Sequence, residues 1–231
     1  MGFASQENLI ENLASIREGI AHACDRCGRD LRTVTLVAAS KTVPAETIAW
    51  AREAGVRDFG ENYVKELRLK AEAVADVRWH FLGTLQSHTA QHVADVADVV
   101  HTLAPGSAAA KLARRAADRG RVIPSLIEVD FTEERTGIAP DAVDAFAGEI
   151  GATPGLVLAG LMTLPPIPAT PEDARPYFAQ LRELGERLRE RHPAAVELSM
   201  GMSLDYEVAV EEGATMVRIG TALFGERPPA N

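Results

Sequence analysis

The sequence has 231 residues, of which 46% are hydrophobic, 25% are charged and 5% are aromatic. This composition is typical of a globular protein and excludes a disordered or fibrous chain. The net charge of −9 argues against nucleic acid as the main partner.

The sequence predicts neither a membrane segment nor a targeting signal. It has no uninterrupted apolar run of about 18 residues, which a bilayer-spanning helix requires. The first ten residues, MGFASQENLI, lack the basic and apolar regions of a secretory signal, and Gln6 breaks the myristoylation pattern. We therefore expect a cytoplasmic protein with no membrane partner.

The first predicted element is an amphipathic helix. Its apolar stripe consists of Leu9, Leu13, Ile16 and Ile20. The only two cysteines, Cys24 and Cys27, follow this stripe. A redox Cys-x-x-Cys pair instead follows a strand and opens a helix, and a zinc site would need more ligands than the nearby His22 supplies. We expect a helix end without redox or metal chemistry.

Eight strand-like apolar runs then alternate with helix-like segments. The runs span residues 34–39, 56–59, 79–82, 98–102, 123–129, 156–162, 195–199 and 215–219. Between them, Ser107 can cap a helix that Gly120 stops, and residues 170–173 (TPED) read as a cap, a first-turn proline and an acidic first turn. The helix that follows keeps an apolar stripe, disturbed early by Pro176. This stripe consists of Tyr177, Leu181, Leu184 and Leu188.

This alternation predicts a parallel sheet, either doubly wound or closed. A doubly wound sheet needs a glycine-rich loop after its first strand, but residues 39–44 read ASKTVP. A minimal barrel has about 200–250 residues. We therefore predict an α/β fold: one domain, residues 1–231, forming a (β/α)8 TIM barrel with an additional N-terminal helix. Its chemistry should lie at the C-terminal ends of the strands.

Lys41 stands at the end of the first predicted strand. The preceding residues, 35–39, are apolar enough to lie inside the barrel, so the amine should be partly desolvated. Desolvation lowers a lysine pKa, which suits a Schiff-base lysine. The alternative is a lysine whose amine reaches solvent from a strand end.

The turns after the seventh and eighth strands indicate a phosphate site. Ser203 at the start of the seventh helix can donate a hydroxyl, and Gly220 and Thr221 can offer backbone N–H groups. Asp205 and Glu207 oppose this reading, because they place negative charge in the same first turn. A plain N-cap at Ser203 and a plain turn at Gly220 remain the alternative.

Arg218 lies close to this turn, in the last predicted strand. A guanidinium inside a barrel mouth needs a partner, and Glu61, Glu197 or a ligand heteroatom are the candidates. A lysine amine, a phosphate cradle and a cation facing a ligand ring together describe a pyridoxal 5′-phosphate (PLP) site.

Five stretches carry a family resemblance in order across nearly the whole chain. They are LVAASKT (36–42), FGENYVKE (59–66), WHFLGTLQS (79–87), GLMTLPP (160–166) and LSMGMSLDYEVAVEEGATMVRIGTALFG (198–225). In these stretches the chain resembles the pyridoxal phosphate homeostasis protein family. The resemblance implies an alanine-racemase-like barrel that holds PLP as an internal aldimine and has no established catalytic turnover.

The resemblance also implies roles for individual residues. Lys41 would form the aldimine, and Arg218 would face the pyridine nitrogen. Asn62 would line the site near the ring, with Ser199 and Met200 as further pocket walls. The phosphate would be held by Ser203, Gly220 and Thr221.

Two positions depart from the family pattern. His88-Thr89 stands where the family usually has Asn-Lys, and Arg135-Thr136 stands where it has Lys-Ser. These changes put in doubt any role for auxiliary lysines in passing PLP onward. His88 and His92 have metal-ligand spacing but lack the acidic partner of a zincin helix, so no metal site is predicted.

Two features favour a carrier over an enzyme. A cationic Arg218 beside the pyridine nitrogen would keep it unprotonated and make the ring a poorer electron sink. Racemases of the implied fold take a second base from an additional C-terminal domain, and this sequence ends six residues beyond Gly225. We therefore expect a PLP carrier or buffer, with apo-PLP enzymes as recipients. Because no coiled-coil heptad or long apolar surface stripe stands out in the sequence, we expect a monomer.

Two other functions remain as alternatives. A weak PLP-dependent racemase or lyase would need a second acid/base from Tyr63, His80 or Cys24. A class I aldolase-type barrel would use the lysine without PLP.

Overall fold

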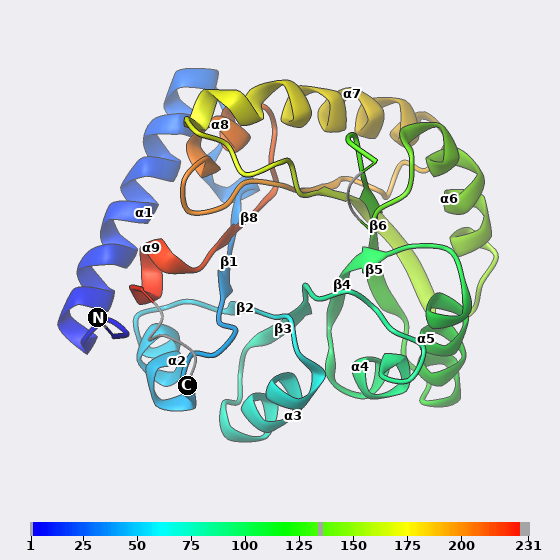
Figure 1. The fold of residues 1–231 in the computed structure, drawn as a ribbon, viewed down its shortest axis with the longest axis horizontal. Coiled ribbons are helices and arrows are strands. Elements are labelled where there is room, and N and C mark those ends of the chain that lie inside the picture. Colours follow the sequence, from blue (N-terminus) through cyan, green and yellow to red (C-terminus); the bar gives the residue numbers. More distant parts are fainter. Residues whose placement is uncertain (1, 134–135, 227–231) are drawn as a thin grey trace.

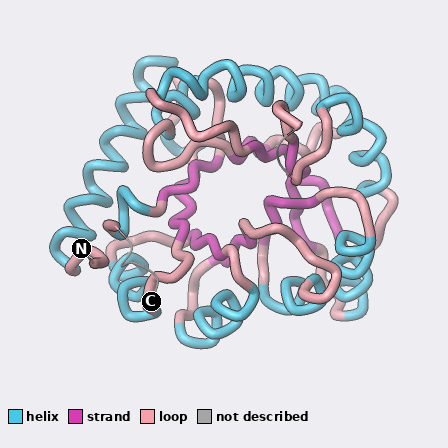
Figure 2. Tube along the Cα trace, in the orientation of Figure 1, coloured by secondary structure: helices cyan, strands magenta, loops and turns pink. Residues whose placement is uncertain are grey.

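The computed structural model describes residues 2–133 and 136–226, and this part of the chain forms a closed parallel barrel (Figures 1 and 2). Its strands are β1 (Thr35–Ala39), β2 (Asp58–Glu61), β3 (Arg78–Phe81), β4 (Val99–Leu103), β5 (Ile123–Val129), β6 (Leu156–Thr163), β7 (Glu197–Ser199) and β8 (Met216–Ile219). Each strand overlaps the run predicted for it, and the (β/α)8 barrel is confirmed.

Closure of the barrel brings the first and last strands together. β1 pairs in parallel with β8, where Val37 lies opposite Arg218, and with β2, where Ala39 lies opposite Gly60. The C-terminal ends of these strands therefore meet at one end of the barrel, as the Lys41 and Arg218 predictions require.

Helices surround the strands on the outside (Figure 2). They are α1 (Gln6–Cys27), α2 (Ala45–Glu53), α3 (Val64–Ala73), α4 (Ala90–Val96), α5 (Ser107–Asp118), α6 (Val143–Gly151), α7 (Arg175–Arg191), α8 (Tyr206–Glu211) and α9 (Thr221–Phe224), with 3-10 turns at Leu31–Thr33, Pro140–Ala142 and Pro171–Ala174. The additional N-terminal helix, α1, packs beside α8 and α9 (Figure 1). None of the helices in the described ranges has the length and apolar character that a bilayer-crossing segment needs.

Helix boundaries follow most of the local signals, with two corrections. Ser107 does not cap α5: it is the first residue of the helix, the N-cap is Gly106, and no side chain caps the helix. The Thr170 cap is confirmed as a capping box with Asp173, and it opens a 3-10 turn that leads into α7. Pro176 falls in the first turn of α7, where a missing N–H costs nothing. The buried stripe of α7 begins at Phe178, whereas Tyr177 is only half-buried and was wrongly placed on it.

The cysteine pair lies in the last turns of α1. The helix includes Cys27 and ends at Gly28, whose φ of 69° is a left-handed C-cap. Both thiols are free, and Cys24 is buried while Cys27 is exposed.

The hydrophobic core has two parts. The larger one lies between the strands and the helices, and a small cluster of Val99, Leu126 and Met162 is separate from it. Polar side chains are also fully or almost fully buried on the strands: His80, His101, Ser199 and Arg218. Barrel interiors are usually filled by branched apolar residues, so this polar content is unusual and bears on the site.

Candidate functional site

A cleft of about 460 Å³ opens at the C-terminal ends of the strands. It is lined by Ala39, Lys41, Asn62, Leu82, Met162, Leu164, Ile167, Pro168, Met202, Ser203, Leu204, Asp205, Arg218, Gly220 and Thr221. Six of the eight predicted cofactor-binding residues therefore share one cavity. Residues from the ends of β1, β2, β6, β7 and β8 meet there because the barrel is closed and parallel.

The remaining two predicted residues lie outside this lining. Ser199 is fully buried and accepts a hydrogen bond from Arg218, so it lies behind the arginine. Met200 is also fully buried and belongs to the main hydrophobic core. Neither side chain forms a wall of the cleft.

The turn that carries Lys41 is held in a strained conformation. Thr42 has a φ of 66°, which is uncommon for a residue other than glycine. Its backbone N–H donates to Glu66 Oε2 at 2.7 Å, and the N–H of Val43 donates to Ser40 O at 2.9 Å. A carboxylate from α3 thus holds the turn that presents the lysine.

Lys70, also on α3, binds the same turn from behind. Its buried ammonium donates to Ser40 O at 2.8 Å, to Glu61 Oε1 at 2.8 Å and to Glu66 Oε2 at 2.7 Å. The hydroxyl of Ser40 also donates to Glu61 Oε1, at 2.6 Å. Burial raises the pKa of Glu61, while Lys70 and Ser40 act to lower it. We call Ser40, Glu61, Glu66 and Lys70 the lysine clamp.

The turns after β7 and β8 are joined at the predicted phosphate end. Ser203 Oγ accepts a hydrogen bond from the N–H of Ala222 at 3.2 Å. α9 begins at Thr221, directly after Gly220, so the N–H groups of its first turn lie beside Ser203. A short helix after the eighth strand is the usual phosphate-binding arrangement of this barrel type.

The structure removes much of the conflict posed by Asp205 and Glu207. The helix that follows Ser203, α8, begins only at Tyr206. Asp205 is 1% exposed and accepts a hydrogen bond from the N–H of Met202 at 2.6 Å, while burial raises its pKa. Glu207 turns away and pairs with Arg26 of α1 at 2.9 Å. The Asp205 carboxylate is therefore hydrogen-bonded within its own turn, and the Glu207 carboxylate points away from the cleft.

Arg218 is held by neutral acceptors. Its Nη1 donates to Ser199 Oγ at 2.6 Å and its Nη2 donates to Thr163 O at 3.0 Å. Burial lowers its pKa to about 10, against the opposing charges of Asp205 and Glu128, so the guanidinium stays protonated near neutral pH.

Neither carboxylate proposed as a partner of Arg218 fills that role. Glu61 binds Lys70, and Glu197 accepts a hydrogen bond from the Thr215 hydroxyl at 2.5 Å. The guanidinium lines the cleft, which leaves a ligand heteroatom as the remaining candidate from the sequence.

The three side chains considered as a second acid or base lie apart from the cleft. His80 is fully buried and hydrogen-bonded to Asp58 and His101. Cys24 is buried on α1, outside the barrel. Tyr63 is 56% exposed at the end of β2, beside Asn62, and is not part of the lining described for this cleft.

The first family departure, His88-Thr89, stands directly before α4. His88 and His92 are both exposed, before and within α4. The described residues contain no group of three His, Cys, Asp or Glu side chains arranged for a metal. Arg135 falls outside the described residues.

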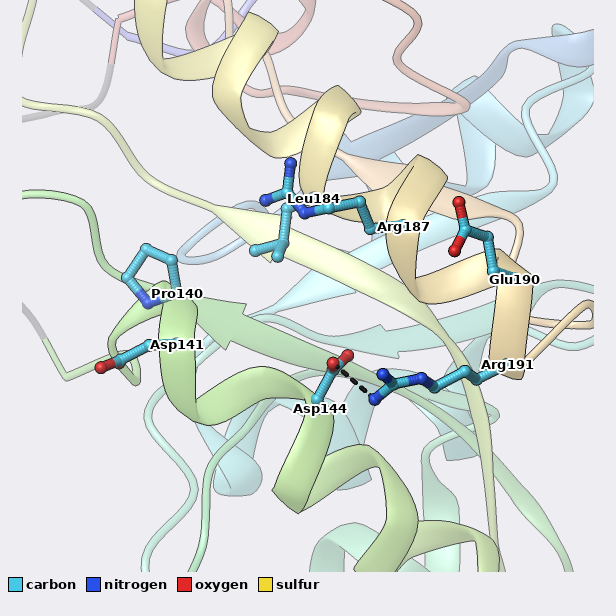
Figure 3. A pocket seen from close by; sticks show the side chains of 7 residues that line it. All are labelled: Pro140, Asp141, Asp144, Leu184, Arg187, Glu190 and Arg191. Carbon is cyan, nitrogen blue, oxygen red and sulfur yellow. Dashed lines mark hydrogen bonds and ion pairs between the residues drawn. The ribbon is translucent and has the colours of Figure 1, made fainter.

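A second groove of about 460 Å³ lies on the outer surface, between α6 and α7 (Figure 3). Arg191 reaches across it to Asp144, with Nη1 and Oδ2 2.8 Å apart (Figure 3). Both side chains are largely exposed, and none of the predicted site residues lines this groove. The chemistry therefore belongs to the cleft at the strand ends.

Sequence reasoning missed the lysine clamp. Glu66 and Lys70 stand four residues apart on a predicted helix, a spacing that signals a pair. The sequence carried no signal that this pair would reach the turn of Lys41, 25 or more residues earlier.

Comparison with known proteins identifies the family. The model of the alanine racemase N-terminal domain matches residues 11–228. A pyridoxal phosphate homeostasis protein of Aquifex aeolicus is 43% identical over 225 residues, covering 95% of this chain and 99% of that protein. The chain belongs to the pyridoxal phosphate homeostasis protein family.

Solved structures agree with this assignment. PipY of Synechococcus elongatus PCC7942, solved with PLP bound, is 34% identical, with a TM-score of 0.83 over 94% of this chain and 100% of that one. Alanine racemase of Corynebacterium glutamicum shares only the fold. It is 13% identical, with a TM-score of 0.71 over 96% of this chain and 61% of that one.

Proposed function

We propose that this chain binds PLP through a Schiff base on Lys41 and acts in PLP homeostasis as a carrier or buffer, without turnover of a substrate. The family assignment and the PLP found in PipY support the cofactor. The single observation that carries the proposal is the cleft, one cavity that is lined by Lys41, Arg218 and the predicted phosphate-binding residues Ser203, Gly220 and Thr221.

The residues of the cleft fit the chemical groups of PLP. An aldehyde requires a primary amine, which Lys41 supplies. A phosphate requires N–H and hydroxyl donors, which the start of α9 and Ser203 offer. A pyridine nitrogen can accept a hydrogen bond from Arg218, which keeps N–H groups beyond the two bound to Ser199 and Thr163.

The residues of the site favour holding the ligand over transforming it. When bound, PLP supplies a reactive aldehyde carbon and an electron-accepting ring. The Lys41 amine condenses with an aldehyde to form a C=N bond and release water, a reversible step. The charge of Arg218 disfavours a second proton on a ring nitrogen that it faces, which weakens the ring as an electron sink.

The first test is retention of PLP by wild type and Lys41→Ala. Each protein is incubated with PLP, freed of excess, and its visible absorption recorded. A second sample is reduced with borohydride and digested, and the labelled peptide is located by mass spectrometry. We expect a stoichiometric visible band and a label on Lys41 in wild type, and neither in Lys41→Ala.

Lys65→Ala is the matched control, because Lys65 is an exposed lysine on α3 and does not line the cleft. It should retain PLP like wild type. A wild-type protein that retains no PLP would refute the cofactor assignment. Label on a lysine other than Lys41 would refute the assigned residue, and amino-acid turnover lost in Lys41→Ala would favour the enzyme alternative.

We further propose that the protein is a cytoplasmic monomer and that apo-PLP enzymes are its recipients. The open cleft at the strand ends supports exchange with outside amines. Sedimentation of the loaded protein tests the monomer. Mixing the loaded protein with an apo-enzyme, with a dialysis membrane between them as the control, separates direct transfer from release into solution.

A further inference from the structure

A chain of buried polar side chains crosses the barrel interior and ends at the cleft. Asp58 Oδ1 lies 2.9 Å from His80 Nε2, and His80 Nδ1 lies 2.8 Å from His101 Nε2. His101 Nδ1 lies 2.8 Å from Ser199 Oγ, which accepts from Arg218 Nη1 at 2.6 Å. The two imidazoles and the serine are 0% exposed. We call Asp58, His80, His101 and Ser199 the barrel relay.

The two ends of the relay determine the direction of its hydrogen bonds. An arginine can only donate, and an ionised carboxylate can only accept. Burial holds the pKa of His101 well below its usual value, so this ring is neutral and carries one N–H. Ser199 therefore accepts from Arg218 and donates to His101 Nδ1. His101 Nε2–H then donates to His80 Nδ1, and His80 Nε2–H donates to Asp58.

The opposite direction leaves a contact unsatisfied. If His101 carried its hydrogen on Nδ1, its bare Nε2 would require a hydrogen on His80 Nδ1. A neutral His80 would then turn a bare Nε2 toward the Asp58 carboxylate, with two acceptors 2.9 Å apart. Buried acceptors that face one another without a hydrogen are costly. With one hydrogen on each ring, the hydrogen bonds are therefore satisfied when both histidines are Nε2–H tautomers.

The relay joins two different environments. At one end, the Asp58 side chain is 15% exposed, lines an open cleft of about 390 Å³, and lies 3.5 Å from Arg78 Nη1. At the other end, Arg218 lines the proposed PLP cleft, with the charges of Asp205 and Glu128 acting on it. Solvent protons thus have access to one end and the ligand to the other.

We propose that the barrel relay positions the guanidinium of Arg218 toward the ring of the bound ligand. The identity of the ring rests on the proposed function; the direction of the relay does not. Ser199 can present a lone pair to Arg218 because its own hydrogen is committed to His101.

The first experiment uses wild-type protein without PLP. Nitrogen-15 NMR of the imidazole rings, tuned to two-bond couplings, distinguishes the two tautomers, and His80→Gln and His101→Gln samples assign the signals among the six histidines. We expect Nε2–H tautomers for both rings near neutral pH. An Nδ1–H tautomer at His101 would overturn the proposed direction, whether or not the protein binds PLP.

The second experiment compares Ser199→Ala with Ser125→Ala. Ser125 is also 0% exposed, but its hydroxyl donates to Ile123 O of its own strand. Both variants lose one buried hydroxyl, and only Ser199→Ala breaks the relay. We expect PLP to bind about tenfold more weakly to Ser199→Ala, and the pH dependence of the visible band to shift. Ser125→Ala should follow wild type in both measurements.

The outcomes separate the two proposals. If Ser199→Ala matches Ser125→Ala in affinity and in its pH profile, the positioning role of the relay is refuted. If wild type retains no PLP, the proposed function fails, and the tautomers still decide the direction of the relay. Thermal unfolding of both variants establishes that they remain folded.

Discussion

Replacing Lys70 by methionine is expected to destabilise the protein by about 3 kcal/mol near neutral pH. The ammonium of Lys70 makes three hydrogen bonds, two of them to the carboxylates of Glu61 and Glu66. Methionine keeps much of the apolar stem and removes only the charge and its donors. Glu61 is 0% exposed, so its carboxylate cannot turn to water instead.

The magnitude follows from the fate of Glu61. Removing one member of a buried ion pair costs about 3–5 kcal/mol. The pKa of Glu61 is already raised by burial, and without Lys70 it rises further in the folded state only. The carboxyl group can therefore take up a proton, which places the expected loss at the lower end of that range.

The sign of the pH dependence follows from the same shift. A folded-state pKa above the unfolded value contributes stability below the unfolded pKa, and this contribution is lost as pH rises through the folded pKa. In wild type, the folded-state pKa of Glu61 is already raised, and the Lys70→Met substitution should raise it further. The loss of stability should therefore be small near about pH 4.5, close to the ordinary glutamate pKa, and grow toward neutral pH.

Urea unfolding of wild type and Lys70→Met at several pH values measures this difference. Lys111→Met is the control, because Lys111 is exposed on α5, and it should change the free energy of unfolding by less than about 0.5 kcal/mol. Adding Glu61→Gln to Lys70→Met should recover part of the loss at neutral pH. A loss that is the same at acidic and neutral pH would refute the role assigned to Glu61.

Three further predictions concern the cleft and the outer surface. Gly201→Ala should lower the melting temperature measured by calorimetry by about 6 °C or more, because Gly201 has a φ of 90° and an added Cβ would lie 2.5 Å from the Cβ of Ala209. An unchanged melting temperature would contradict the strain argument. Ser203→Ala should weaken PLP binding about tenfold in equilibrium dialysis, and equal affinity would remove Ser203 from the phosphate site. Arg191→Ala should change the free energy of unfolding by less than about 1 kcal/mol, because its pair with Asp144 is exposed; a larger loss in urea would be inconsistent with that pair being weak.

The sequence determined the elements and the position of the site along the chain. Apolar runs and turn residues are local signals, and the strand at 123–129 agrees with its prediction at both ends. Barrel chemistry collects at strand ends, so Lys41 and Arg218 could be selected before any contact was known. The structure then places both in one cleft.

Only the tertiary structure decided which buried polar groups meet. Alternate residues of a strand face opposite sides, so a single position decides whether a side chain enters the barrel or faces a helix. Asp58 reaches His80, whereas Glu61, three positions on, reaches Lys70 of α3 rather than Arg218. From the sequence, Glu61 was singled out and Asp58 was not. Barrel closure and strand register, which depend on contacts far apart in the chain, assigned Asp58 to the relay and Glu61 to the lysine clamp.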